Sequence, residues 1–166
     1  MTQALRLAAL LLVIQVSSAC AQCPSFPVDT ARVREELVIE YTTFRDAFMR
    51  NTPQAWINAL DSSFTLTLFS GAVMPKDWVE NYVRTNAAQF HIRTLQMEIQ
   101  SITVQADTAT ATVRQTSNRD FTDEHGVLHR LEVSARQIET WVCTTTGWRI
   151  RHVKEDSLLY LRRDSR

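Results

Sequence analysis

The apolar positions change their period from helical to strand-like about half-way along the chain. Over residues 33–48 they recur at spacings of four, four, three and four, which matches one face of an α-helix. Asp29 or Thr30 can cap the start of this helix by accepting its first backbone N–H groups. The predicted apolar face consists of Val33, Leu37, Tyr41, Phe44 and Phe48.

Two shorter helices are predicted after the first. Asn51-Thr52-Pro53 ends the first helix and starts a second, from Gln54 to about Leu60, with Thr52 as its N-cap. Pro75 opens a third helix. The apolar residues that share one face of this third helix are Trp78, Tyr82 and Phe90.

The strand period appears first in residues 64–69 and then dominates the second half. Further strands are predicted over residues 95–104, 109–116, 131–144 and 148–153. The alternation changes phase just before Ile102, which predicts a β-bulge. Thr146-Gly147 is predicted to form a tight turn, which makes the last two strands antiparallel neighbours. Helices that are segregated from an antiparallel sheet indicate the α+β class.

Composition limits the kind of protein this can be. The chain has 166 residues, 45% of them apolar and 22% charged, which is typical of one globular domain with a buried core. Lys and Arg together number 18, and so do Asp and Glu. A chain without excess positive charge gains little from releasing counterions on a polyanion, so no nucleic-acid partner is expected.

The first 21 residues have the pattern of a signal peptide. Arg6 is the only charged side chain, residues 7–16 form an apolar run, and Ala19 and Ala21 fit an A-x-A cleavage site. The apolar run is about half the length that spans a bilayer, so no membrane span is expected. We therefore expect residues 1–21 to be removed and residues 22–166 to form a single exported domain, periplasmic or secreted. The alternative is a lipoprotein anchored at Cys20.

Cys23 and Cys143 remain after this cleavage. Two cysteines in an oxidising compartment predict a disulfide. The alternative is that Cys143 is a buried small hydrophobic residue and Cys23 a free thiol. The predicted mature chain, residues 22–166, contains no CxxC or HExxH motif, so no metal site is predicted. His125 and His129 flank Gly126 and are expected to be exposed near a turn.

Several segments resemble one superfamily when their order is considered. They are Tyr41–Phe48, Trp56–Phe64, Gly71–Trp78, Glu139–Val142 and the turn at Gly147 with Trp148–Ile150. In that order they are similar to the nuclear transport factor 2-like superfamily, the fold shared by SnoaL-like polyketide cyclases and ketosteroid isomerases. The resemblance covers about Arg32 to Val153.

The resemblance implies a cone-shaped barrel, in which a curved antiparallel sheet packs on three N-terminal helices around a cavity. It also implies a homodimer and no cofactor. The isomerases of this superfamily use a base carboxylate with a tyrosine and a protonated acid as oxyanion hole. No Tyr–Asp–Asp set in this chain matches that pattern.

Candidate catalytic residues follow from strand parity. His152 lies an even number of residues from Trp148, so both are expected to face the same side of the sheet. The same holds for Glu139 and Trp141. Counting from the Thr146-Gly147 turn places Glu139 diagonally next to His152, which predicts an acid–base couple. Asp61 is expected to join them from the helical side. The residues expected to bind the ligand are Tyr41, Trp56, Trp78, Tyr82, His91 and Trp141. If the opposite sheet face is inward, Arg114 and Arg136 line the cavity instead.

Two functions are consistent with these expectations. The favoured one is an exported domain that binds a hydrophobic small molecule without established catalysis. The alternative is a cofactor-independent acid–base enzyme of isomerase, cyclase or hydrolase type that acts on a hydrophobic small molecule. A buried carboxylate in an open cavity favours the enzyme, whereas a cavity filled by aromatic side chains favours an assembly module.

Processing provides the first testable prediction. Because Ala19 and Ala21 fit the cleavage pattern, exported protein should begin at Gln22. Intact-mass spectrometry of secreted material measures this directly. A diacylglycerol on Cys20 would contradict the prediction and establish the lipoprotein alternative.

Overall fold

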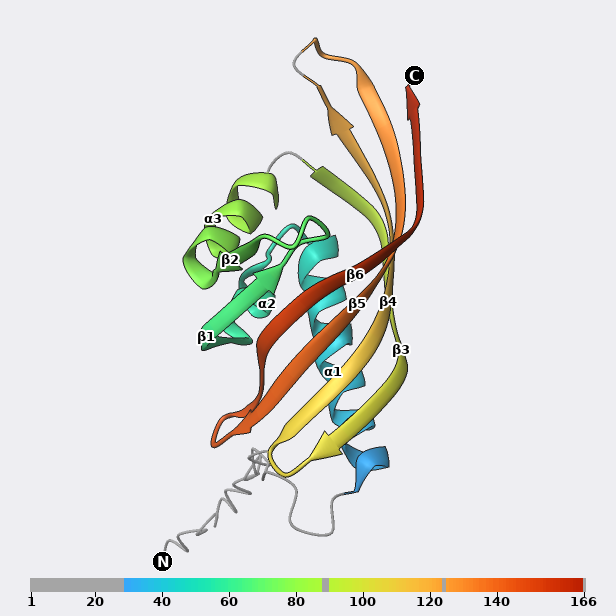
Figure 1. Ribbon diagram of the computed structural model, residues 1–166. Coiled ribbons are helices and arrows are strands. Elements are labelled where there is room, and N and C mark those ends of the chain that lie inside the picture. Colours follow the sequence, from blue (N-terminus) through green and yellow to red (C-terminus); the bar gives the residue numbers. More distant parts are fainter. Residues whose placement is uncertain (1–28, 88–89, 124, 166) are drawn as a thin grey trace, which may run out of the picture.

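The computed structural model describes residues 29–87, 90–123 and 125–165. A layer of helices lies against one face of a six-stranded sheet, and the sheet curves around that layer (Figure 1). The predicted signal peptide and Cys23 lie outside the described residues, so processing and export stay predictions. No helix in the described part of the chain is long and apolar enough to cross a membrane.

Helix α1 (Thr30–Met49) forms where the sequence predicts it. The Asp29 carboxylate caps its start by accepting hydrogen bonds from the backbone N–H groups of Ala31 and Arg32. Its predicted apolar face is confirmed, with Ala47 buried in addition and Phe48 only partly buried. The buried residues of this face are Val33, Leu37, Tyr41, Phe44 and Ala47.

The two later helices differ in detail from the prediction. Helix α2 (Gln54–Asn58) has Pro53 rather than Thr52 as its N-cap and ends earlier, because Leu60 already begins a strand. In helix α3 (Lys76–Ala87) the residue that faces the core is Val79, which is 2% exposed. Trp78 and Tyr82 share a face as predicted, and their rings stack with centroids 5.2 Å apart, but both rings are exposed.

The sheet has the order β2-β1-β6-β5-β4-β3. Its strands are β1 (Leu60–Thr67), β2 (Val73–Pro75), β3 (Phe90–Gln105), β4 (Thr108–Thr122), β5 (Leu128–Thr144) and β6 (Gly147–Ser165). The expected antiparallel barrel needs two corrections. The sheet is open, with β2 and β3 at its edges, and it is mixed, because β1 pairs with β6 in parallel.

The register of the strands decides which side chains face the helices. The β3–β4 pairing shifts between Ile99 and Ser101, which confirms the bulge predicted in this segment. The last hairpin differs from the prediction, because Thr144 pairs with Gly147 and the loop residues are therefore 145 and 146. The β5–β6 pairing also skips Arg151, so that Trp141 pairs with Ile150 and Thr140 with His152. Beyond this bulge, each residue of β6 pairs with a different residue of β5 than counting from the Thr144–Gly147 pair would give.

The core lies between α1 and the inner face of the sheet. Phe44 of α1 and Trp141 of β5 stack with their centroids 6.0 Å apart, and both are fully buried. Tyr41 meets Trp141 edge-on at 5.6 Å. These contacts fix the position of α1 across the middle of the sheet.

Candidate functional site

A cavity of about 250 Å³ lies between the helices and the inner face of the sheet. Most of its wall is apolar. Its lining residues are Phe48, Trp56, Phe64, Leu66, Val79, Tyr82, Val83, Ile92, Leu95, Met97, Gln115, Ser117, Arg119, Gln137, Glu139, Val153 and Glu155. The strand residues among them alternate, as in Gln115, Ser117 and Arg119 of β4, because every second side chain points to the same face.

Glu139 is the buried carboxyl group in this wall. Its side chain is only 2% exposed and lines the cavity from β5. The Tyr41 hydroxyl donates a hydrogen bond to Glu139 Oε2 at 2.7 Å, and the Trp141 indole N–H donates to the same oxygen at 3.0 Å. Neither of these bonds involves the other oxygen, Oε1.

Burial controls the ionisation of this group. Removal from water raises the pKa of Glu139 to about 7, although the hydrogen bonds from Tyr41 and Trp141 act in the opposite direction. Burial also raises the pKa of Tyr41 well above its usual value, and the neighbouring Glu139 adds to this. Tyr41 therefore stays a hydrogen-bond donor, while Glu139 can change between acid and carboxylate near neutral pH.

The predicted Glu139–His152 couple does not form. Opposite Glu139 lies Val153, and His152 pairs with Thr140, which points to the other face of the sheet. The His152 ring lies 2.8 Å from the Thr65 hydroxyl through Nδ1, and it does not line the cavity. The bulge at Arg151 is the reason, because one extra residue moves His152 from the inner to the outer face.

Asp61 is also remote from the cavity. Its carboxylate accepts hydrogen bonds from the backbone N–H and the hydroxyl of Ser63, at 3.0 and 2.6 Å, and these bonds lower the pKa of Asp61. Its Oδ1 also lies 4.0 Å from Arg151 Nε. A carboxylate held in this way belongs to the start of β1 and is not part of the cavity lining.

The other candidate residues are divided between the cavity and the surface. Tyr41 and Trp141 contact Glu139, and Trp56 and Tyr82 line the cavity. Trp78 stacks on Tyr82 but is not part of the lining, and His91 is exposed on β3. On the alternative face, Arg136 pairs with Asp156 and Arg114 donates to Ser134.

Five polar lining residues were missed from the sequence. They are Gln115, Ser117, Arg119, Gln137 and Glu155. Gln137 has the parity of Glu139 and could have been found from it. Arg119 and Glu155 depend on the long β4–β5–β6 pairing, which strand alternation alone does not define. Burial lowers the pKa of Arg119, and nearby Tyr82 acts in the opposite direction.

The structure bears on two further expectations. Within the described residues, no group of three His, Cys, Asp or Glu side chains could hold a metal ion. Cys143 is 7% exposed at the end of β5. Since Cys23 lies outside the described residues, the Cys23–Cys143 disulfide stays a prediction.

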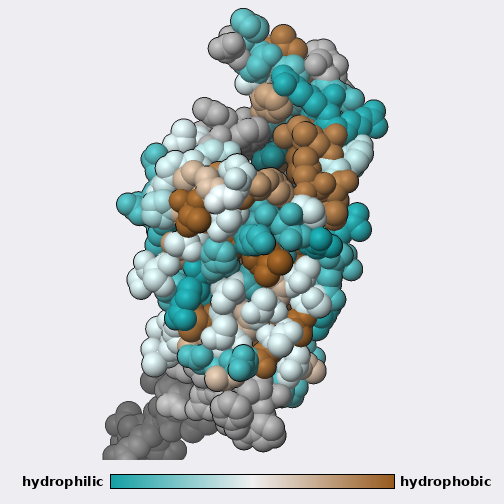
Figure 2. All heavy atoms as spheres, viewed as in Figure 1, coloured by the Kyte–Doolittle hydropathy of each residue, from teal (hydrophilic) through white to brown (hydrophobic). Residues whose placement is uncertain are grey.

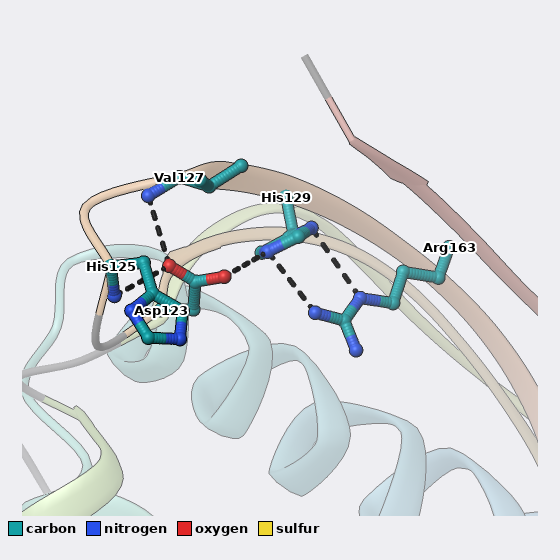
Figure 3. A network of polar contacts seen from close by, with 5 residues as sticks. All are labelled: Asp123, His125, Val127, His129 and Arg163. Carbon is teal, nitrogen blue, oxygen red and sulfur yellow. Dashed lines mark hydrogen bonds and ion pairs between the residues drawn. The ribbon is translucent and has the colours of Figure 1, made fainter.

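A second polar cluster lies at the far end of the β4–β5 hairpin (Figure 3). Asp123 Oδ1 accepts hydrogen bonds from the backbone N–H groups of His125 and Val127, and Oδ2 lies 2.7 Å from His129 Nε2. Arg163 approaches the same ring from β6 at 3.0 Å. The expected exposure of His129 is wrong, because the closed turn directs its ring back over the sheet, where it is 5% exposed.

Comparison with solved structures identifies the fold. The chain is 15% identical to a nuclear transport factor 2-like protein from Cytophaga hutchinsonii, with a TM-score of 0.59 over 76% of this chain and 96% of that one. It is 10% identical to a nuclear transport factor 2-like protein of unknown function from Shewanella baltica, with a TM-score of 0.53 over 83% and 97%.

An enzyme candidate has the same fold. A protein of Novosphingobium aromaticivorans, described as a candidate scytalone dehydratase, is 11% identical, with a TM-score of 0.60 over 80% of this chain and 87% of that one. No protein-family model matches the chain, and no curated protein sequence matches it. These likenesses confirm the resemblance in fold that the sequence predicts.

The Tyr41–Glu139 hydrogen bond yields a prediction about stability. Tyr41→Phe removes a donor from a buried carboxyl group, which should lower the free energy of unfolding by about 1–3 kcal/mol. The loss should be larger at pH 8 than at pH 5, because the ionised carboxylate depends more on its donors. Urea unfolding at both pH values measures this, and an equal loss at the two would show that the hydroxyl does not interact with a titrating group.

The raised pKa of Glu139 yields a prediction about pH. The folded state holds this proton up to about pH 7 and the unfolded state only to about pH 4.5, so the contribution of Glu139 to stability is largest at low pH and falls as the pH rises between these values. The loss is at most about 3 kcal/mol. Glu139→Gln should remove it and give a flatter profile in urea unfolding from pH 5 to pH 8.

Glu155→Gln is the matched control for this measurement. It also removes a carboxyl group from the cavity wall, but Glu155 is only partly buried, and its carboxylate accepts a hydrogen bond from the Phe69 backbone N–H. Its profile should keep the slope of the unchanged protein between pH 5 and pH 7. A Glu139→Gln profile parallel to that of the control would contradict the assignment of the slope to Glu139.

Proposed function

Because the chain has the nuclear transport factor 2-like fold and an apolar cavity with one buried carboxyl group, we propose that it is an exported domain that binds a hydrophobic small molecule. Glu139 supports this proposal, because it is the one buried carboxyl group in a mostly apolar wall. Such a combination orients a ligand by one polar contact while apolar burial supplies most of the affinity.

The size of the cavity defines the class of ligand. Its volume of about 250 Å³ is slightly below the range of about 300–1,000 Å³ that is common for ligand pockets. A compact ligand with one polar group therefore fits better than an extended lipid or a peptide. Aromatic rings from three different elements, namely Phe48, Trp56 and Phe64, form one side of the wall, which suits a flat or cyclic apolar body.

The second candidate function is acid–base catalysis without a cofactor. The observation that favours it is the pKa of Glu139, which burial raises to about 7. A carboxyl group that gains and loses its proton near neutral pH can act as general acid or base on a bound substrate through Oε1. Tyr41 would support either form by donating to Oε2.

Ligand binding should depend on Glu139. A thermal-shift screen with a library of compact hydrophobic metabolites identifies ligands, and calorimetry at pH 5.5 and pH 8.5 then measures their affinities. A ligand with a carbonyl acceptor should bind more tightly at pH 5.5, because only the protonated Glu139 donates to it. Losing a hydrogen bond of this kind should weaken binding about tenfold.

Two variants make the result specific. Glu139→Gln should abolish the pH dependence of binding, whereas the control Glu155→Gln should retain it. If the ligands bind both variants and the unchanged protein with equal affinity at both pH values, Glu139 is not the polar contact. The enzyme alternative is distinguished by turnover of a bound ligand, which Glu139→Gln should abolish while binding persists.

A further inference from the structure

One edge of β6 is open along the second half of this strand. β1 pairs with β6 only as far as Lys154, whereas β5 follows the opposite edge to Ser165. Among the residues that the structure describes, no strand pairs with the first edge beyond Lys154. This part of β6 extends past the helical layer toward the C-terminus (Figure 1). Its backbone N–H and C=O groups on that edge can pair with another chain.

The open segment is unusually apolar for an edge strand. Figure 2 shows apolar side chains gathered over the upper part of the sheet, where β6 leaves the helices. The exposed fractions of four consecutive residues are 49% for Leu158, 47% for Leu159, 43% for Tyr160 and 56% for Leu161. A run of exposed apolar side chains on an open edge is typical of an interaction surface.

Charged residues flank this apolar run with opposite signs. Glu155 and Asp156 precede it, and Arg162 and Arg163 follow it. Leu159 is the midpoint of this segment. The two acidic residues lie as far before it as the two arginines lie after it. An antiparallel second copy therefore places its arginines beside the acids of the first copy at both ends, whereas a parallel copy places like charges together.

We propose that the segment Glu155–Arg163 of β6 is the docking site for the same segment of a second copy, with the two running antiparallel. The resemblance of the chain to a dimeric superfamily leads us to expect a homodimer, and this segment supplies a surface for it. The contact is two-fold symmetric, so each ion-pair position occurs twice and the interface closes on itself. The apolar run supplies the buried area, and the charges set the direction.

Each of the four charged residues already has a contact within one chain. Glu155 lines the cavity and accepts a hydrogen bond from the Phe69 backbone N–H. Asp156 lies 2.6 Å from Arg136, with side chains 23% and 45% exposed, and Arg162 lies 3.2 Å from Asp164 in a largely exposed pair that contributes little to stability. A guanidinium group has five N–H donors, so Arg163 can keep its contact with His129 (Figure 3) and still meet an acid. Asp156 and Leu159 have no partner in the β5–β6 register, so the edge of β6 bends at these two residues. The proposed contact therefore depends more on side-chain packing than on a continuous row of backbone hydrogen bonds.

A complementary pair of charge variants tests the proposal. The first carries Glu155→Arg and Asp156→Arg, and the second carries Arg162→Glu and Arg163→Glu. In each variant all four flanking charges have the same sign, so a symmetric dimer brings like charges together. Sedimentation velocity of the purified chain should show a dimer for the unchanged protein. The dissociation constant should rise at least about tenfold in each variant alone.

Mixing the two variants distinguishes this surface from any other. The mixture should form a heterodimer with an affinity close to that of the unchanged dimer, because opposite charges then meet at both ends. Near-ultraviolet circular dichroism checks that each variant keeps the packed Trp141 and Trp148 core. A monomeric unchanged protein, or dimers that persist equally in both variants alone, would overturn the proposal.

A cross-linking variant decides the matter if a charge variant does not fold. Leu159 lies at the centre of the symmetric pattern, so Leu159→Cys should form a disulfide-linked dimer under mild oxidation. Ile39→Cys is the matched control, because Ile39 is also an exposed apolar residue, at 65%, but lies on α1. Cross-linking of the control to the same extent, or of neither variant above the unchanged chain, would refute the assigned surface.

Discussion

The burial of the Glu139 carboxyl group is the constraint on which the arrangement of the domain depends. A carboxyl group with 2% exposure is costly unless hydrogen bonds replace its water, and Tyr41 and Trp141 both donate to it. Since Tyr41 comes from α1 and Glu139 from β5, this requirement fixes the helix over one point of the sheet. The ring contacts among Tyr41, Phe44 and Trp141 then pack around the same point.

The same constraint gives the cavity its chemistry. Two donors contact one oxygen of Glu139, and the residue lines the apolar cavity between the helices and the sheet. Both proposed functions, binding and acid–base catalysis, use this arrangement, because a group that orients a ligand at neutral pH can also exchange a proton with it. The ligand, rather than a second catalytic side chain of the protein, decides between the two functions. His152 and Asp61 are committed to hydrogen bonds elsewhere.

The sheet lies in two different environments along its length: one part is covered by helices and the other is not. Near α1 its inner face is covered and encloses the cavity, whereas the far parts of β4, β5 and β6 extend past the helices (Figure 1). Glu155 lies at the boundary, since it lines the cavity and also begins the open segment of β6. The apolar side chains of Leu158, Leu159 and Leu161 beyond it are exposed, and they form the surface that we propose for a second copy of the chain.

The sequence by itself determined the features that depend on local period. The helical spacing placed Tyr41 on the buried face of α1, and strand parity placed Glu139 and Trp141 together, so the centre of the site was predictable. The phase break near Ile102 likewise located a real bulge. Register was decided by the tertiary structure, because it depends on loops and bulges that alternation does not reveal. One extra residue at Arg151 moved His152 to the outer face, and the open sheet replaced the expected barrel because closure depends on pairing between distant strands rather than on any local pattern.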